Sequence, residues 1–216
     1  MMLPAQTFDG FLFDMDGTLL TSIPSVERVW SAWARGHGID AEAFLQRIHG
    51  IQALEVVRRE NLPGIDPLRE VEAIVQAELA DLDGTEAIAG ARDFLERLPP
   101  DRWAIVTSAQ RQLALARLSA VGLPLPAVLI CAEDVPNSKP APDGFLMAAA
   151  RLGVEPTRCL VFEDSHAGVT AGEAAGASVI VVSATHGSPW PLAHRVIADY
   201  RGLRLVAREE GFAIEA

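Results

Sequence analysis

The sequence predicts an α/β protein with a doubly wound parallel sheet, an all-helical insert and a C-terminal β-hairpin. Three observations support this fold class. Short apolar runs rich in β-branched residues recur along the chain, and segments with helical spacing separate them. Parallel neighbours need a crossover connection, so this alternation favours a parallel sheet covered on both faces. Between Phe13 and Gly90 the alternation stops, and only helical patterns are found.

Five strands are expected in the sheet, with helices between them. The strands are predicted at residues 8–13, 103–106, 128–131, 159–162 and 179–182. The helices are predicted at residues 90–98, 110–121, 144–152 and 166–175. Open α/β sheets place their chemistry at the carboxyl ends of the strands, so polar residues there are candidates for a site.

The stretch after the first strand is predicted to contain four helices and no second strand. These helices are expected at residues 24–36, 41–48, 53–60 and 67–79. Ser22 is the expected cap of the first, with Pro24 in its first turn. We therefore expect a helical cap at 21–83 above a core made of 1–20 and 84–216. Residues 203–208 and 212–215, on either side of a turn, predict the hairpin.

Composition indicates a globular protein with an acidic surface. The chain has 216 residues, of which 50% are apolar and 22% charged, and a formal net charge of −11. Such a surface repels nucleic acid and anionic lipid at long range. We expect no signal peptide and no membrane span, and buried reduced thiols at Cys131 and Cys159. The resulting expectation is a cytoplasmic monomer or homodimer without nucleic-acid or membrane partners.

Polar side chains gather at three predicted strand ends and in one loop. They are Asp14 and Asp16, Thr107 and Ser108, Glu163 and Asp164, and the loop residue Lys139. Taken singly, these segments fit an Asx-turn, a helix N-cap and a solvated lysine. Taken together, they place several carboxylates, two hydroxyls and one ammonium along one sheet edge.

This set of groups suits the binding and hydrolysis of a phosphate ester. Oxygen ligands without a nearby histidine or cysteine favour Mg²⁺. The metal and Lys139 would supply the positive charge that an acidic protein needs to hold a phosphoryl group. A carboxylate can attack phosphorus to give an aspartyl-phosphate. A second acid two residues later can protonate the leaving alcohol and then activate water.

The motifs resemble those of the haloacid dehalogenase (HAD) superfamily of phosphatases. Residues 14–19 match its D-x-D-G-T-L opening, and the other three motifs follow in order at 107–108, 139–140 and 163–164. The resemblance implies a Rossmann-like core with Asp14 as nucleophile and Asp16 as general acid and base. It also implies that Thr107, Ser108 and Lys139 bind phosphate. Mg²⁺ would be bound by Asp14, the carbonyl oxygen of Asp16, and Asp164, with Glu163 acting on it through water.

Within that superfamily, segments 25–30, 48–50, 103–108 and 139–143 look most like the small sugar-phosphate phosphatases. These include phosphatases of 2-deoxyglucose-6-phosphate, glycerol phosphate and hexitol phosphate. We therefore expect a Mg²⁺-dependent phosphatase that hydrolyses a small phosphorylated sugar or polyol. The alternative is a phosphoglycolate or nucleotide phosphatase with the same mechanism.

Two other classes of protein are disfavoured. In sugar phosphomutases of the family an arginine grips the distal phosphate, and the aligned residue here is Ala53, with Arg58 or Arg59 as substitutes. A phosphoacceptor signalling domain usually lacks a helical insert and carries its acceptor on a later strand than Asp14. His49 is open to two interpretations, a hydrogen bond to a substrate hydroxyl or a helix-end position.

Overall fold

The central feature is a parallel sheet, seen in a computed structural model that describes residues 6–48, 50–185 and 194–215. Its six strands lie in the order β5-β4-β1-β6-β7-β8, and each neighbouring pair is parallel. The strands are β1 (Gly10–Phe13), β4 (Trp103–Val106), β5 (Val128–Ile130), β6 (Cys159–Glu163), β7 (Ser178–Val182) and β8 (Arg195–Ile197). The predicted parallel sheet is confirmed, and β8 is an addition because three residues are too few to show a strand pattern.

The strand order reverses beside β1. β4 pairs with one side of β1 and β6 with the other, so Phe13 lies opposite both Ile105 and Phe162. In open α/β sheets, ligands bind in the crevice outside the carboxyl ends at such a point. The segments that follow β1, β4 and β6 therefore meet at one edge of the sheet.

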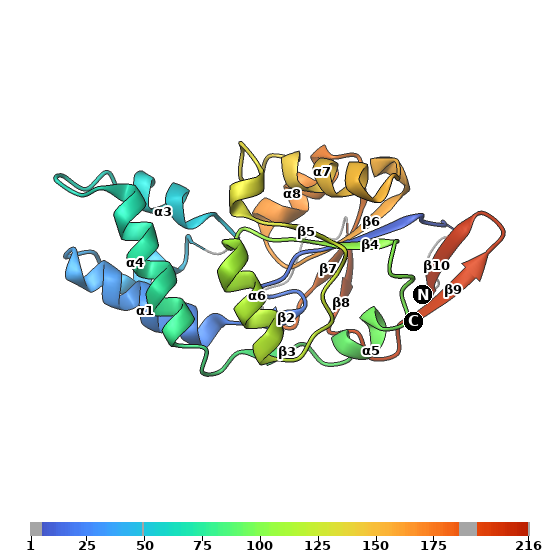
Figure 1. Cartoon of the computed structure of the whole chain (residues 1–216), viewed down its shortest axis with the longest axis horizontal. Helices are drawn as coiled ribbons and strands as arrows, with labels where there is room; N and C mark the ends of the chain where they lie inside the picture. The colour runs from blue at the N-terminus through green and yellow to red at the C-terminus, as the bar shows by residue number, and fades with distance from the viewer. Residues whose placement is uncertain (1–5, 49, 186–193, 216) are drawn as a thin grey trace.

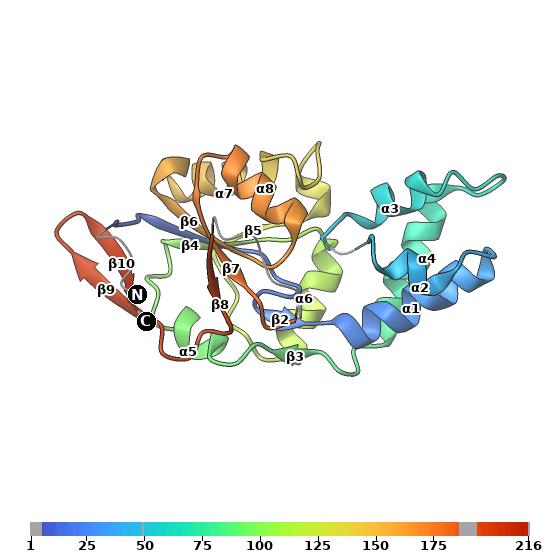
Figure 2. The same cartoon turned by 180° about the vertical axis from the view of Figure 1, so that it is seen from behind.

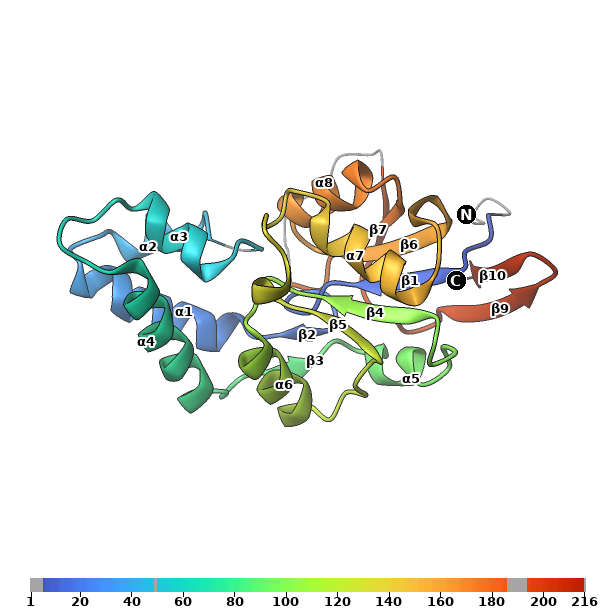
Figure 3. The ribbon, with the colours of Figure 1, turned by 45° about the horizontal axis from the view of Figure 1, so that its top comes forward.

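Helices cover both faces of the sheet, as Figures 1 and 3 show. One face carries α7 (Asp143–Leu152) and α8 (His166–Ala174), and the other carries α5 (Ala91–Leu95) and α6 (Arg111–Ala120). Successive strand residues point to opposite faces. Accordingly Leu12 packs in one cluster with Phe145 of α7, whereas Phe13 packs in another with Phe94 of α5. Burial on both faces explains why the strands read as continuous apolar runs.

The helical cap gathers at one end of the molecule (Figures 1 and 2). It contains α1 (Ile23–Gly36), α2 (Ala41–Leu45), α3 (Ala53–Arg59) and α4 (Pro67–Ala80). These helices bury a cluster of their own around Trp30, Phe44 and Val71, and Leu113 of α6 joins it. The second predicted helix ends earlier than expected, at Leu45. The cap is thus confirmed, and its bounds at 21–83 stay a prediction.

The expectation of no strand between Phe13 and Gly90 is wrong. β2 (Leu20–Thr21) pairs antiparallel with β3 (Glu86–Ala87), so that Leu20 faces Ala87 and Thr21 faces Glu86. Two residues cannot show the alternation by which a strand is recognised in sequence. The chain leaves the core and returns to it along this two-stranded ribbon.

The C-terminal hairpin is confirmed at the end of the molecule opposite the cap (Figure 1). It consists of β9 (Arg204–Arg208) and β10 (Gly211–Glu215), which pair antiparallel. Phe212 packs against Phe11 with their ring centroids 6.3 Å apart. Short 3-10 helices lie at η1 (Ala132–Asp134) and η2 (Pro156–Arg158). Among the helices in the described ranges, none has the length and apolar character needed to cross a membrane.

Replacement of Phe13 by alanine is expected to lower the free energy of unfolding by about 3–5 kcal/mol. Phe13 is fully buried, and its ring stacks on Phe162 with the centroids 4.7 Å apart. Urea unfolding measures the loss. Leu125→Ala is the control, since its side chain is 61% exposed and should change stability by no more than about 0.5 kcal/mol. Equal losses for the two variants would contradict this packing.

Candidate active site

A buried ion cluster lies at the carboxyl edge of the sheet, where β1, β4 and β6 end. The Nζ of Lys139 donates to Oδ1 of Asp14 at 2.6 Å, to Oε1 of Glu163 at 2.7 Å and to the carbonyl oxygen of Val106 at 3.1 Å. Lys139 is only 7% exposed, so the solvated-lysine interpretation is wrong. One ammonium therefore joins the ends of three strands.

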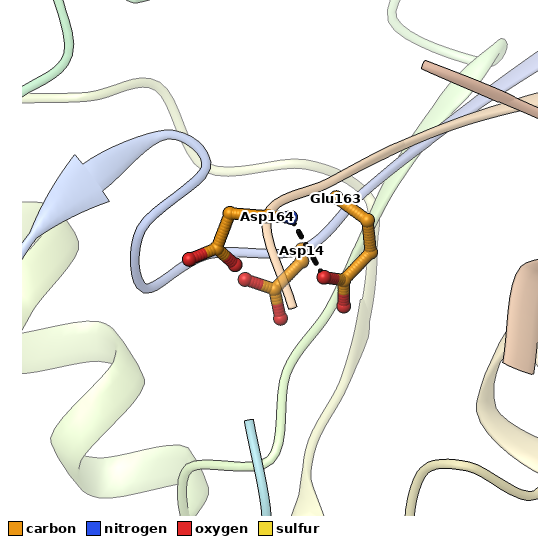
Figure 4. Close-up of side chains that lie close together, drawn as sticks. All are labelled: Asp14, Glu163 and Asp164. Carbon is orange, nitrogen blue, oxygen red and sulfur yellow. Dashed lines mark hydrogen bonds between the residues drawn. The ribbon is translucent and has the colours of Figure 1, made fainter. Parts of the chain in front are cut away.

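Glu163 is held on both of its carboxylate oxygens. Oε1 accepts from Lys139, and Oε2 accepts from the backbone N–H groups of Asp164 and Ser165 at 2.8 Å and from the Ser165 hydroxyl at 3.0 Å. Figure 4 shows the bond to Asp164 as a dashed line. A carboxylate with this many donors is suited to orient Lys139 and the following loop.

The carboxylates of this cluster crowd together. One oxygen from each of Asp14, Glu163 and Asp164 lies within 4.8 Å of the others (Figure 4). Burial raises the pKa of the Asp14 carboxyl well above its ordinary value, and its two acidic neighbours add to this against the opposing effect of Lys139. Burial alone would lower the pKa of Lys139, but the Asp14 and Glu163 carboxylates outweigh it and the pKa is raised.

The residues of the cluster fit a hard divalent cation. Three buried carboxylates face one ammonium, which leaves an excess of negative charge away from water. The donors are oxygen atoms, and these are the ligands that Mg²⁺ takes in proteins. A cation of this kind would balance the charge of the cluster.

Gly17 brings the loop after Asp16 against Asp164. Its φ of +91° lies in the region that favours glycine, and a Cβ there would be 1.9 Å from Oδ2 of Asp164. The hydroxyl of Thr18 donates to Oδ1 of Asp164 at 3.4 Å. The backbone near Asp16 and the side chains of Asp14 and Asp164 therefore occupy one corner of the site.

Thr107 and Ser108, which follow β4, have different surroundings. Thr107 is 5% exposed, and its hydroxyl accepts from the N–H of Ala109 at 3.1 Å. The Ser108 hydroxyl donates to the carbonyl oxygen of Gly50 at 2.9 Å, in the cap. Both residues line the same cavity as Asp14, and the hydroxyl hydrogen of Ser108 is already donated to the cap loop.

A cavity of about 270 Å³ lies between this sheet edge and the cap. Its polar floor includes Asp14, Asp16, Thr107 and Asp164. Its cap-side wall is apolar and is formed by residues that include Val26, Trp30, Val56, Val71 and Val75. A polar floor under an apolar wall can bind a charged group at one end of a small molecule and shield it from water.

Sequence reasoning missed the contacts of Asp16, to which Arg117 and Ser22 donate, and the pairing of Arg117 with Glu78. Arg117 donates through Nη1 to Oδ1 of Asp16 at 3.0 Å and through Nη2 to Oε1 of Glu78 at 3.2 Å. Ser22 precedes α1 as expected, but its side chain does not cap the helix and instead donates to Oδ1 of Asp16 at 2.6 Å. The sequence does not reveal the pairing of Arg117 with Glu78, because only the packing of α4 on α6 brings the two residues together.

Arg58 and Arg59 are exposed, and Arg59 pairs with Glu55 at 2.9 Å. Ala53 lines the cavity. Cys131 and Cys159 are buried free thiols, as expected. His49, whose interpretation was open, lies outside the described residues.

The fold and the site together define a class of protein. A Rossmann-like sheet with an ion cluster at its switch point and a helical cap facing that cluster is the architecture of a capped α/β hydrolase. The family model for haloacid dehalogenase-like hydrolases matches residues 8–176, which include every residue of the cluster, and the chain belongs to this family.

Individual relatives resemble the chain over most of its length. Hexitol phosphatase A of Escherichia coli (strain K12) is 44% identical over 83% of this chain and 85% of its own. 2-Deoxyglucose-6-phosphate phosphatase 2 of Saccharomyces cerevisiae is 29% identical over 85% of this chain and 83% of its own length. A solved hydrolase structure from Pseudomonas syringae has a TM-score of 0.77 and 27% identity, and it covers 90% of this chain and 94% of that chain.

Lys139→Met is expected to lower the free energy of unfolding by about 3–5 kcal/mol in metal-free buffer, because it leaves buried carboxylates without a counter-charge. The deficit should shrink as the pH falls. Burial raises the pKa of Asp14 in the folded protein above its value in the unfolded chain. Ionisation of Asp14 therefore lowers the free energy of unfolding as the pH rises, and protonation at low pH removes this loss.

Urea unfolding at several pH values measures this deficit. Arg111→Met is the matched control, since Arg111 pairs with Asp134 at a site where its side chain is 39% exposed. Removal of such a partly exposed pair costs about 1 kcal/mol or less. A Lys139 deficit no larger than that of the control would contradict the buried cluster.

Proposed function

We propose that this protein is a Mg²⁺-dependent phosphatase that hydrolyses small sugar or polyol phosphate monoesters through an aspartyl-phosphate at Asp14. The observation that carries the proposal is the Asp14 carboxylate itself. It lies at the floor of the cavity between the sheet edge and the cap, and Lys139 holds one of its oxygens at 2.6 Å. A fixed, buried carboxylate next to a cation is well placed to attack a phosphorus atom that the same cation attracts.

In the first step, a carboxylate oxygen of Asp14 attacks phosphorus, and the bond between phosphorus and the alcohol oxygen breaks. Asp16 donates its proton to that oxygen, so the alcohol leaves neutral. Lys139 and Thr107 bind the phosphoryl oxygens. The hydroxyl of Ser108 is directed to the cap loop in the structure, so we assign it to the same site through its position beside Thr107.

In the second step, Asp16 takes a proton from water, and the water oxygen attacks the phosphorus of the aspartyl-phosphate. The bond to Asp14 breaks, and inorganic phosphate leaves with the original carboxylate restored. Asp14, the carbonyl oxygen of Asp16 and Asp164 would hold Mg²⁺, with Glu163 acting through water. When bound, the metal supplies positive charge next to the phosphoryl oxygens.

The dimensions of the cavity favour a small alcohol. At about 270 Å³ it lies just below the usual range for small-molecule sites, roughly 300–1,000 Å³. A sugar or polyol phosphate suits this space better than a nucleotide. The relatives named above are a hexitol phosphatase and a 2-deoxyglucose-6-phosphate phosphatase, which supports the same substrate class.

A sugar phosphomutase is disfavoured by the same cavity. The residue aligned with the phosphate-gripping arginine is Ala53, which lines the cavity, and both Arg58 and Arg59 are exposed. Among the described lining residues, the one arginine is Arg117, and its guanidinium is already engaged with Asp16 and Glu78. A second phosphate would have no arginine to bind it.

Phosphate release from a panel of monoesters tests the proposal. The panel contains hexitol, hexose, glycerol and glycolate phosphates and nucleoside monophosphates, each with Mg²⁺ and with EDTA. We expect Mg²⁺-dependent release that is fastest with hexose or hexitol phosphates. Asp14→Asn should lower the rate by about 10³-fold or more without unfolding the protein. Release that persists in EDTA, or a tenth of the activity retained by Asp14→Asn, would refute the mechanism.

Gly17→Ala is expected to raise the Mg²⁺ concentration for half-maximal activity about tenfold or more, in the range seen when a metal site is disturbed. The new Cβ would lie 1.9 Å from Oδ2 of Asp164 and must displace that carboxylate. Gly38→Ala is the matched control, since its φ of +71° also lies in the left-handed region but no atom lies within 4 Å of the new Cβ. An unchanged Mg²⁺ requirement in Gly17→Ala would argue against Asp164 as a ligand.

A further inference from the structure

Arg117 is a buried cation within reach of the catalytic floor. It lies on α6 with 3% of its side chain exposed, and it lines the cavity. Its two terminal nitrogens donate to different carboxylates, Nη1 to Asp16 at 3.0 Å and Nη2 to Glu78 at 3.2 Å. A guanidinium has a fixed planar shape, so the position of one carboxylate constrains the other.

Within the part of the chain that the structure describes, the side-chain hydrogen bonds of Asp16 involve one of its two oxygens. Oδ1 accepts from Nη1 of Arg117 and from the hydroxyl of Ser22, at 3.0 Å and 2.6 Å. A guanidinium keeps its protons at any ordinary pH, so it always acts as a donor. Oδ1 is therefore an acceptor whenever these contacts are made. The proton that Asp16 gives to an alcohol then has its place on Oδ2.

Glu78 connects this arrangement to the cap. It lies on α4, is 5% exposed, and occupies the same buried helix stripe as Val71 and Val75. Because α4 belongs to the cap and α6 to the core, the guanidinium of Arg117 spans the boundary between them. Through Glu78, the cap therefore helps to hold the guanidinium of Arg117 against Asp16.

We propose that Arg117 is a positioning residue for the proton transfer, held by Glu78 of the cap so that it fixes Oδ1 of Asp16 and presents Oδ2 to the leaving alcohol. The inference rests on the proposed role of Asp16 as general acid. It assigns to Arg117 and Glu78 an action on the reaction through Asp16, without contact to the substrate.

A purely structural ion pair between α4 and α6 is the competing explanation, and the choice of leaving group separates the two. The value of kcat/KM reports the steps up to departure of the alcohol. A sugar or polyol alkoxide is a poor leaving group that needs protonation, whereas p-nitrophenolate leaves readily without it. Loss of a positioning residue should therefore affect hexitol phosphate much more than p-nitrophenyl phosphate.

The experiment compares kcat/KM for these two esters in the wild type and in a set of variants. Arg117→Met combined with Glu78→Gln removes both charges, so that neither is left buried alone. Arg117→Lys keeps a cation for Glu78 but lacks the planar guanidinium whose two nitrogens hold the two carboxylates at fixed positions. It replaces the double variant if that variant fails to fold. Arg111→Met, on the same helix, is the control.

In the double variant and in Arg117→Lys, we expect kcat/KM for hexitol phosphate to fall about tenfold or more, as it does when a catalytic group is misplaced. For p-nitrophenyl phosphate we expect kcat/KM to fall less than about threefold. Arg111→Met should match the wild type on both esters. In an Asp16→Ala background the same substitutions should cause no further fall in kcat/KM, because the effects of substituting residues that act as a unit do not add.

Equal losses on the two esters, or a full additional loss in the Asp16→Ala background, would overturn the inference. If Asp16→Ala itself still shows the selective loss on hexitol phosphate, the proposed function stands. If Asp16→Ala lacks that selectivity, or the wild type releases no phosphate, the proposed function fails and the inference fails with it.

Discussion

Three carboxylates and one lysine are buried together at the carboxyl edge of the sheet, and the rest of the structure depends on how their charges are balanced. Lys139 bonds to Asp14 and Glu163, and backbone N–H groups bond to the far oxygen of Glu163. The parallel register of β1 with β4 and β6 brings these groups together, and the close approach of Gly17 to Asp164 leaves no room for a side chain at that position. The remaining negative charge is the basis for expecting a divalent cation there.

The cap completes the site from the other side. Its loop contacts the sheet edge through the Ser108 hydroxyl on the Gly50 carbonyl oxygen and through the Gln52 amide on the Ala132 carbonyl oxygen, at 2.9 and 3.1 Å. The cavity therefore has a charged floor from the core and an apolar wall from the cap. Most of the polar groups of the site therefore come from the core, whereas most of the apolar side chains that border the cavity come from the cap.

Much of the fold was predictable because its signals are local. Buried parallel strands read as apolar runs, and the helices between them show their periodicity, so the sheet, the cap and the hairpin follow from the sequence. The paired strands β2 and β3 were missed because a strand of two residues is too short to show an alternating pattern of apolar and polar residues. The carboxylates of the ion cluster were found through their positions at strand ends, and Lys139 was found in the loop before residue 140. Arg117 and Glu78 were missed because each looks solvated on its own helix, and only the packing of α4 on α6 brings them together.

The ribbon of β2 and β3 has a consequence for how the family diversifies. Leu20 faces Ala87 and Thr21 faces Glu86, so the chain departs from the core and rejoins it at adjacent points. An insertion whose two ends are already paired adds little strain to its host. Evolution can therefore exchange or enlarge the helices beyond the ribbon while the chemistry of the sheet edge is inherited unchanged.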